Sequence, residues 1–191
     1  MDPLFGIPVG LALSAAAGLR VFVPLLMTGV AARLGALPLA PGMAWIGCDV
    51  ALVAFATATV VEVCAYYIPW LDNLLDAIAT PVAVTAGVML TAAATPDLSP
   101  FLRWSLAVVA GGGAAGLVQA STALLRLKSS TFTAGAGNSL IATGELAGAV
   151  VLSLVGILAP LLAAVVVVAL LIVLANRFAR RRREQRRASP R

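Results

Sequence analysis

The amino-acid sequence predicts an all-α membrane protein, a polytopic helical bundle of about six spans, with five as the alternative. Of its 191 residues, 61% are hydrophobic and only 11% are charged, whereas a soluble domain carries about 25% charged residues. Its apolar runs approach the ~20 residues that a helix needs to cross the hydrocarbon core. We therefore expect one transmembrane domain over residues 1–178, followed by a basic, disordered cytoplasmic tail over 179–191.

Five apolar stretches supply the predicted spans. They cover residues 7–32, 46–68, 81–95, 101–126 and 140–178. As one helix the last stretch would be roughly 58 Å long, about twice the thickness of the hydrocarbon core. We therefore divide it near Pro160, which brings the predicted number of spans to six.

Two segments between these spans differ in character. Residues 69–80 have the pattern of a short amphipathic helix at the membrane interface, with leucines on one side and Asp72 and Asp76 on the other. These two carboxylates are one helical turn apart, which predicts either a cation or proton relay or simply the water-facing side of this helix. Residues 127–140 are rich in Ser, Thr and Gly and indicate a polar loop or a re-entrant segment.

The basic residues are concentrated at the C-terminus. Eight of the 13 lysines and arginines lie in residues 176–191. Beside an apolar span, such a run is typical of a cytoplasmic topology anchor rather than of a nucleic-acid site. With either five or six spans, the excess of positive charge places the C-terminus in the cytoplasm.

The residue types needed for common catalytic sites are missing. The sequence has no histidine, which removes the usual general base near neutral pH and the commonest metal ligand. It contains no Ser/His/Asp set, no phosphate-binding loop and no cluster of metal ligands. We therefore expect a protein that is not an enzyme and that holds neither a metal nor a cofactor.

Small residues recur every four positions on three of the predicted helices. They are Gly6, Gly10, Ser14 and Gly18 on the first, Gly112 and Gly116 on the fourth, and Gly144 and Gly148 on the fifth. Lipid provides no hydrophobic drive for helices to associate, so close backbone approach through small residues has to supply it. We expect these ridges to be helix contacts.

Arg20 stands near the centre of the first predicted span, four residues before Pro24. An isolated arginine at mid-bilayer costs at least about 2.5–3.5 kcal/mol, so this side chain must face the protein interior and find an acceptor. Glu62 and Glu145 are the carboxylates within the apolar segments, and we favour Glu145 because Gly144 and Gly148 flank it. Two readings stay open: a structural ion pair that sets helix register, or an anion or proton-linked site.

Further polar residues complete the predicted cluster. Gln119, Asn138 and Thr143 lie within or beside the spans that would surround Arg20. Pro24 frees the carbonyl of Arg20 from helical hydrogen bonding. A broken helix beside a buried charge is typical of transporter binding sites.

Three stretches of this chain resemble a known family. They are "SAAAGLRVFVPLL", "YYIPWLDNLLDAIATPVAVTAG" and "LLRLKSSTFTAGAGNSLIATGELAGAVVLSLVGILAPLLA". Together they are similar to an uncharacterised bacterial integral-membrane family, domain of unknown function 4126, over about residues 8–175. Where that family favours Asn-Pro, this chain has Asn138-Ser139. The resemblance implies a small polytopic protein of the bacterial plasma (inner) membrane, and it implies no activity.

The function that we expect is that of a small transporter or permease for an anionic solute or a lipid headgroup. Arg20 would bind the anion, Glu62 or Glu145 would accept a proton, and Gln119 and Asn138 would line the site. The alternative is a scaffold that transports nothing and assembles with other proteins through its small-residue ridges. Expected partners are membrane lipid, an anionic small molecule and a second copy of the chain, with no nucleic acid.

Overall fold

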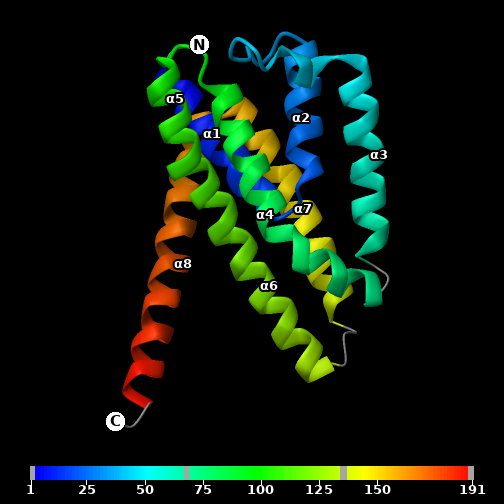
Figure 1. Cartoon of the computed structure of the whole chain (residues 1–191), viewed down its shortest axis with the longest axis vertical. Helices are drawn as coiled ribbons and strands as arrows, with labels where there is room; N and C mark the ends of the chain where they lie inside the picture. The colour runs from blue at the N-terminus through cyan, green and yellow to red at the C-terminus, as the bar shows by residue number, and fades with distance from the viewer. Residues whose placement is uncertain (1–2, 67–68, 134–136, 189–191) are drawn as a thin grey trace.

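The computed structural model describes the backbone of residues 3–66, 69–133 and 137–188, and this described part is helical and contains no strand (Figure 1). The elements are α1 (Pro3–Ala17), α2 (Phe22–Arg33), η1 (Ala44–Gly47), α3 (Asp49–Ala65), α4 (Pro69–Ala94), α5 (Pro100–Leu106), η2 (Ala107–Gly112), α6 (Gly113–Thr133), α7 (Asn138–Leu158) and α8 (Pro160–Ala188). The predicted all-α class is confirmed.

Helices α1 and α2 form a hairpin, and the prediction of one span over residues 7–32 is wrong. Gly6, at the start of α1, lies against the backbone of Ala94 at the end of α4. Ala40, shortly after α2, donates its N–H to the carbonyl of Ala93 at 2.8 Å. The outer ends of both helices are therefore at the same end of the bundle, and Figure 1 shows α2 running back beside α1.

The hairpin turn explains the error. Helix α1 ends at Ala17 and α2 begins at Phe22, so Pro24 falls in the first turn of α2. Proline is tolerated there, because the N–H groups of that turn have no partner within the helix. The apolar sequence continues across the turn and hides it, although helices of 15 and 12 residues are each shorter than the ~20 residues of a full span.

Three helical segments of the described chain are long and apolar enough to cross a membrane. They are Pro100–Ser129, Asn138–Leu158 and Pro160–Arg177. Shorter apolar helices cover Phe5–Ala17, Phe22–Arg33 and Ile78–Ala94. The molecule therefore has the helices of a polytopic membrane protein, and the number of spans stays a prediction.

Helix α4 is continuous over the segment for which the sequence predicts two helices. Pro81 lies inside it, and the first turns of α4 run at an angle to the rest (Figure 1). Because Pro81 lacks an N–H, it weakens one turn without ending the helix. The predicted separate helix over 69–80 is therefore wrong. Asp72 and Asp76 lie outside the residues whose side chains the structure describes.

The predicted polar loop over residues 127–140 is also largely helical. Helix α6 continues to Thr133, and α7 begins at Asn138. Thr131 donates its hydroxyl to the carbonyl of Leu127, a local bond that lets a polar side chain remain in a helix. Directly before α6 lies the π-helical segment η2, whose glycines Gly111 and Gly112 face α4.

The division at Pro160 is confirmed. Ala159 has φ −138° and ψ 66°, outside the helical region, and Pro160 opens α8. Helix α8 continues through Ala188, where the sequence predicts a disordered tail from residue 179. The arginines, glutamate and glutamine of this tail are good helix formers, so they extend the preceding helix.

Helix α1 lies at the centre of the molecule, and its small residues bring it close to α4. Gly10 contacts the backbone of Thr91. The Ser14 hydroxyl donates to the Gly87 carbonyl and lies 2.7 Å from the hydroxyl of Thr91. Gly18, just after α1, contacts the carbonyl of Ala115 in α6 instead. The predicted first ridge is a contact inside the chain, and it orients α1 so that its last turn reaches the middle of the bundle.

The other two ridges differ from each other. Gly112 and Gly116 contact valine side chains of α4, as the sequence predicts. Gly148 touches Leu19, whereas the Cβ position of Gly144 has no neighbour within 4 Å among the described residues. Gly144 therefore provides no close approach to Arg20, and this part of the argument for Glu145 is wrong.

Candidate functional site

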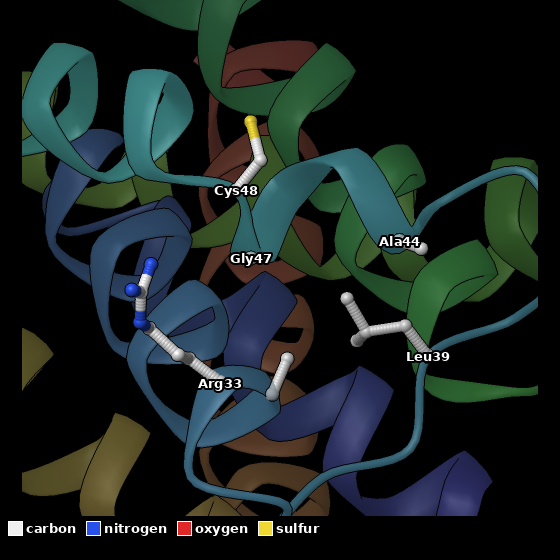
Figure 2. Close-up of a pocket in the computed structure, with 6 residues that line it drawn as sticks. Arg33, Leu39, Ala44, Gly47 and Cys48 are labelled. Carbon is white, nitrogen blue, oxygen red and sulfur yellow. The ribbon is translucent and has the colours of Figure 1, made fainter.

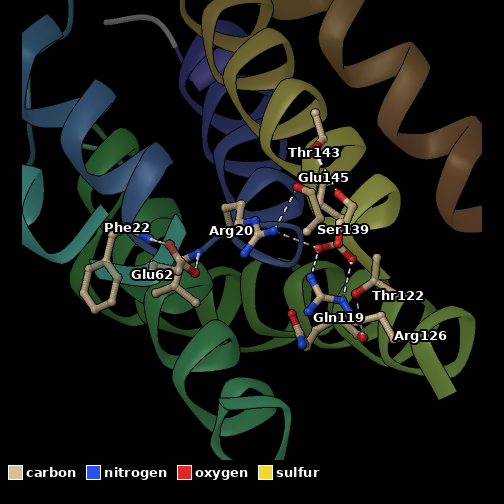
Figure 3. Close-up of polar contacts among 11 residues, drawn as sticks. Arg20, Phe22, Glu62, Gln119, Thr122, Arg126, Ser139, Thr143 and Glu145 are labelled. Atoms are coloured by element: carbon tan, nitrogen blue, oxygen red, sulfur yellow. Dashed lines mark hydrogen bonds and ion pairs between the residues drawn. The ribbon is translucent and has the colours of Figure 1, made fainter. Parts of the chain in front are cut away.

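Arg20 lies in the turn between α1 and α2 and is only 2% exposed. Its Nη2 donates to the carbonyl of Ala142 at 2.8 Å and lies 3.4 Å from Oε2 of Glu145 (Figure 3). The predicted contact with Glu145 is therefore present. Within the described residues, Nε and Nη1 of Arg20 have no hydrogen-bond acceptor.

Glu145 is shared by two arginines. Arg126 of α6 donates Nε–H to Oε1 at 3.1 Å and Nη2–H to Oε2 of the same carboxylate. Arg126 is 3% exposed and Glu145 is 5% exposed. The ion pair thus joins α6, α7 and the hairpin turn, in a place where water is largely excluded.

Tyr66 lies against both guanidinium groups. The Cζ atoms of Arg20 and Arg126 are 3.9 and 4.0 Å from the centroid of its ring. A cation over an aromatic ring is attracted by the negative face of the π-system, and the attraction increases as water is removed. Tyr66 immediately follows the end of α3, so this ring links α3 to the arginines.

Glu62 holds the start of α2. Its carboxylate accepts the backbone N–H groups of Val21 at 2.9 Å and of Phe22 at 3.2 Å. These donors have no partner within α2, and a negative charge is favoured at the positive end of a helix. Figure 3 shows the Arg20 side chain between the Glu62 and Glu145 carboxylates. The hairpin turn is therefore flanked by both glutamates that the sequence predicts.

The other predicted site residues are less directly involved. Gln119 is buried on α6, and its backbone carbonyl accepts a hydrogen bond from the hydroxyl of Thr122 at 3.0 Å. Asn138 is buried at the start of α7 on the same face as Glu145, seven residues earlier. Thr143 is exposed, and its hydroxyl donates to Ser139. Gln119 and Asn138 therefore border the cluster, and Thr143 points away from it.

Two residues of the cluster, Arg126 and Tyr66, are not predicted from the sequence. Arg126 stands at the end of the predicted fourth span, beside the polar stretch that was expected to be a loop, so it reads as a residue at the membrane surface. A signal existed in the spacing, because Gln119, Thr122 and Arg126 are three and seven residues apart and form one polar face of a helix. A polar face on an otherwise apolar helix indicates a buried polar site.

A cavity of about 590 Å³ adjoins the site. Its inner wall includes Val21, Phe22, Glu62 and Tyr66, and its rim is formed mainly by apolar side chains of α3 and α4. The volume lies within the range of about 300–1,000 Å³ typical of small-molecule sites. Glu62 thus faces both the helix start and an apolar space.

A smaller cavity of about 270 Å³ lies at the other end of α2 (Figure 2). Arg33 and Cys48 are among its lining residues. Arg33 is half exposed and forms an ion pair with Asp49. This cavity therefore has the features of a surface hollow, with its charge already paired.

The described residues contain no group of three or more His, Cys, Asp or Glu side chains arranged to hold a metal ion. Comparison with protein families finds a match between residues 7–181 and the model of a domain of unknown function, DUF4126. The chain belongs to this family. No curated protein and no solved structure matches the DUF4126 chain. Its function has to be argued from the buried site.

Proposed function

We propose that this DUF4126 protein is a membrane transporter or permease for an anionic substrate, with Arg20 as the anion partner and Glu62 as the proton acceptor. The observation that carries the proposal is the pair of N–H donors on Arg20. Nε and Nη1 are buried and have no acceptor in the described chain. Buried donors nearly always have a hydrogen-bond acceptor in native proteins. We therefore expect a bound anion to accept these two N–H groups.

The backbone around Arg20 supports an anion site. The hairpin turn interrupts the helix inside the bundle, and α2 directs its N-terminal N–H groups toward the same place. Discontinuous helices whose positive ends face anionic groups are the usual construction of substrate sites in secondary transporters. In this structure the N–H groups of Val21 and Phe22 donate to the Glu62 carboxylate.

The charge balance supports coupling to a proton. Arg20 and Arg126 are balanced by Glu62 and Glu145, and Tyr66 is a further titratable side chain that contacts the group. A bound monoanion would leave one negative charge uncompensated, which is costly away from water. Protonation of Glu62 removes that cost, and Glu62 borders a cavity while Glu145 is enclosed between two arginines.

The packing of the small residues argues against the scaffold alternative. A scaffold would present its ridges to other proteins, whereas Gly6, Gly10 and Gly18 contact backbone atoms of this chain. The proposed function also requires no enzymatic chemistry. We place the protein in the bacterial plasma membrane with its basic tail in the cytoplasm. Membrane lipid is then one of its partners.

Proteoliposomes that contain a pH-sensitive dye test the proposal. Phosphate, sulfate, lactate and hexyl phosphate are added outside in turn, and internal acidification is recorded against protein-free liposomes, which correct for passive permeation of the acids. We expect protein-dependent acidification with at least one anion, and its loss in Glu62→Gln. Folded protein that gives no signal above the protein-free liposomes with any of the four would contradict the proposal.

A further inference from the structure

The cavity beside Glu62 opens onto the apolar side of the bundle. Val61 of α3 and Ile78 and Val82 of α4 are among its lining residues, and they are exposed. On a membrane protein, we expect exposed valine and isoleucine side chains of this kind to face lipid tails. A molecule that enters between α3 and α4 therefore comes from the bilayer.

The inner end of the cavity adjoins the arginines. Tyr66 lines the cavity, and the Arg20 and Arg126 guanidinium groups lie over its ring. Val21, which also lines the cavity, follows Arg20 directly in the chain. A single aromatic ring thus separates an apolar space from two buried cations.

We infer that this cavity is a membrane-side binding site for a single-chain amphiphile with an oxyanion head group, and that this is the substrate class of the protein. The inference rests on the proposed function. The apolar chain would lie between α3 and α4, and the oxyanion would accept the two N–H groups of Arg20 that have no acceptor in the described chain. Rotation of the Tyr66 ring would admit the head group.

The hydrogen bonding favours an anionic over a cationic head group. Both oxygens of Glu62 already accept backbone N–H groups. An ammonium group would therefore compete with two existing bonds, whereas an oxyanion would satisfy buried donors of Arg20 that have no acceptor among the described residues. Charge-assisted hydrogen bonds of this kind are about twice as strong as neutral ones.

Photolabelling in lipid nanodiscs tests the inference. It measures binding and not transport, because fatty acids also cross bilayers without a protein. The probe is a dodecanoate analogue with a photoreactive group on its chain, and labelled residues are located by mass spectrometry. We expect labels on cavity residues such as Ala54, Ala58 and Val82. Excess dodecanoate should compete for them, and dodecanol and dodecylamine should not.

Three variants sharpen the test. Arg20→Gln should weaken competition by dodecanoate at least about tenfold, because the loss of even one charge-assisted hydrogen bond has about that effect. Ala58→Trp should fill the cavity and remove the label. Val60→Trp is the matched control, because Val60 is exposed on α3 and does not line the cavity. It should leave labelling unchanged.

Several results would overturn the inference. They are labels spread evenly over the lipid-facing surface, competition by dodecylamine instead of dodecanoate, and unchanged labelling in Ala58→Trp. This last variant decides the matter even if Arg20→Gln fails to fold. Transport of phosphate, sulfate or lactate without cavity labelling would refute this inference alone. Labelling without transport of any anion would instead refute the proposed function.

Discussion

At the scale of single residues, the site depends on one carboxylate that serves two cations. Glu145 pairs with both Arg20 and Arg126, whereas Arg20 also bonds to the carbonyl of Ala142. Removing one member of a buried ion pair leaves the other charge uncompensated, which costs more than the pair contributes. The two ends of this network should therefore respond unequally to substitution.

Glu145→Gln should be the most destabilising change in the cluster. It leaves two buried arginines without their shared partner, and we expect a loss of about 3–5 kcal/mol in the free energy of unfolding. Arg20→Met should cost less, about 1–2 kcal/mol, because Arg126 still holds Glu145. Unfolding in one detergent measures both. An equal or larger loss in Arg20→Met would contradict the shared role of Glu145.

The pairing of Arg20 could be predicted from the sequence, and the full cluster could not. A buried arginine needs an acceptor, and few carboxylates occur in the apolar segments, so Glu62 and Glu145 follow by elimination. The role of Arg126 depends on how far α6 extends toward its C-terminal end. The polar residues after Arg126 suggest a loop and so conceal the length of this helix. The bonds from Glu62 to Val21 and Phe22 exist only because the helix breaks at that point.

At the scale of elements, glycines decide which helices approach closely. A Cβ on Gly18 would lie 2.5 Å from the carbonyl oxygen of Ala115 and 2.7 Å from Cβ of Val118. Neither backbone nor a β-branched side chain gives way easily. At Gly144 the same atom would meet nothing within 4 Å in the described chain.

Gly18→Ala and Gly144→Ala should therefore have different effects on stability. The first should lower the melting temperature and weaken the hairpin turn, because the end of α1 must move away from α6. The second should be neutral or stabilising by up to about 1 kcal/mol, since alanine is the better helix former. Thermal unfolding of the two variants side by side checks this. Equal destabilisation would show that the packing around Gly18 is not as described.

The elements also show where sequence patterns lose information. Apolar composition marks α7 and α8 correctly, and Pro160 divides them because the stretch is too long for one span. The same reasoning joins α1 to α2, since 7–32 has about the length of one span. The contacts of Gly6 and Ala40 with the end of α4 reveal the hairpin. Such tertiary contacts leave no periodicity in the sequence.

At the scale of the whole molecule, the hairpin places the two ends of the chain at opposite ends of the bundle (Figure 1). Figure 1 shows the end of α2 and the start of α5, the elements that carry Arg33 and Arg103, toward the end where α1 begins, and the ends of α6 and α8 toward the other. From the concentration of positive charge near the end of α8, we expect that end to face the cytoplasm.

Reporter fusions should find the C-terminus in the cytoplasm and the N-terminus outside. Six full crossings, the prediction from sequence, would place both termini on the same side, so the two fusions separate the alternatives. A fluorescent protein that folds only in the cytoplasm and a phosphatase that is active only outside it are suitable reporters. Both termini on the cytoplasmic side would contradict the hairpin.

We propose that Arg20 binds the transported anion. The most direct measurement is internal acidification of proteoliposomes, with an anion that the wild-type protein transports, in Arg20→Met and Arg33→Met. Arg33 is the matched control, because it is exposed and paired with Asp49. We predict that Arg20→Met elutes as a folded protein and gives only the protein-free rate, and that Arg33→Met transports at about the wild-type rate. Transport by Arg20→Met at the wild-type rate would contradict the claim.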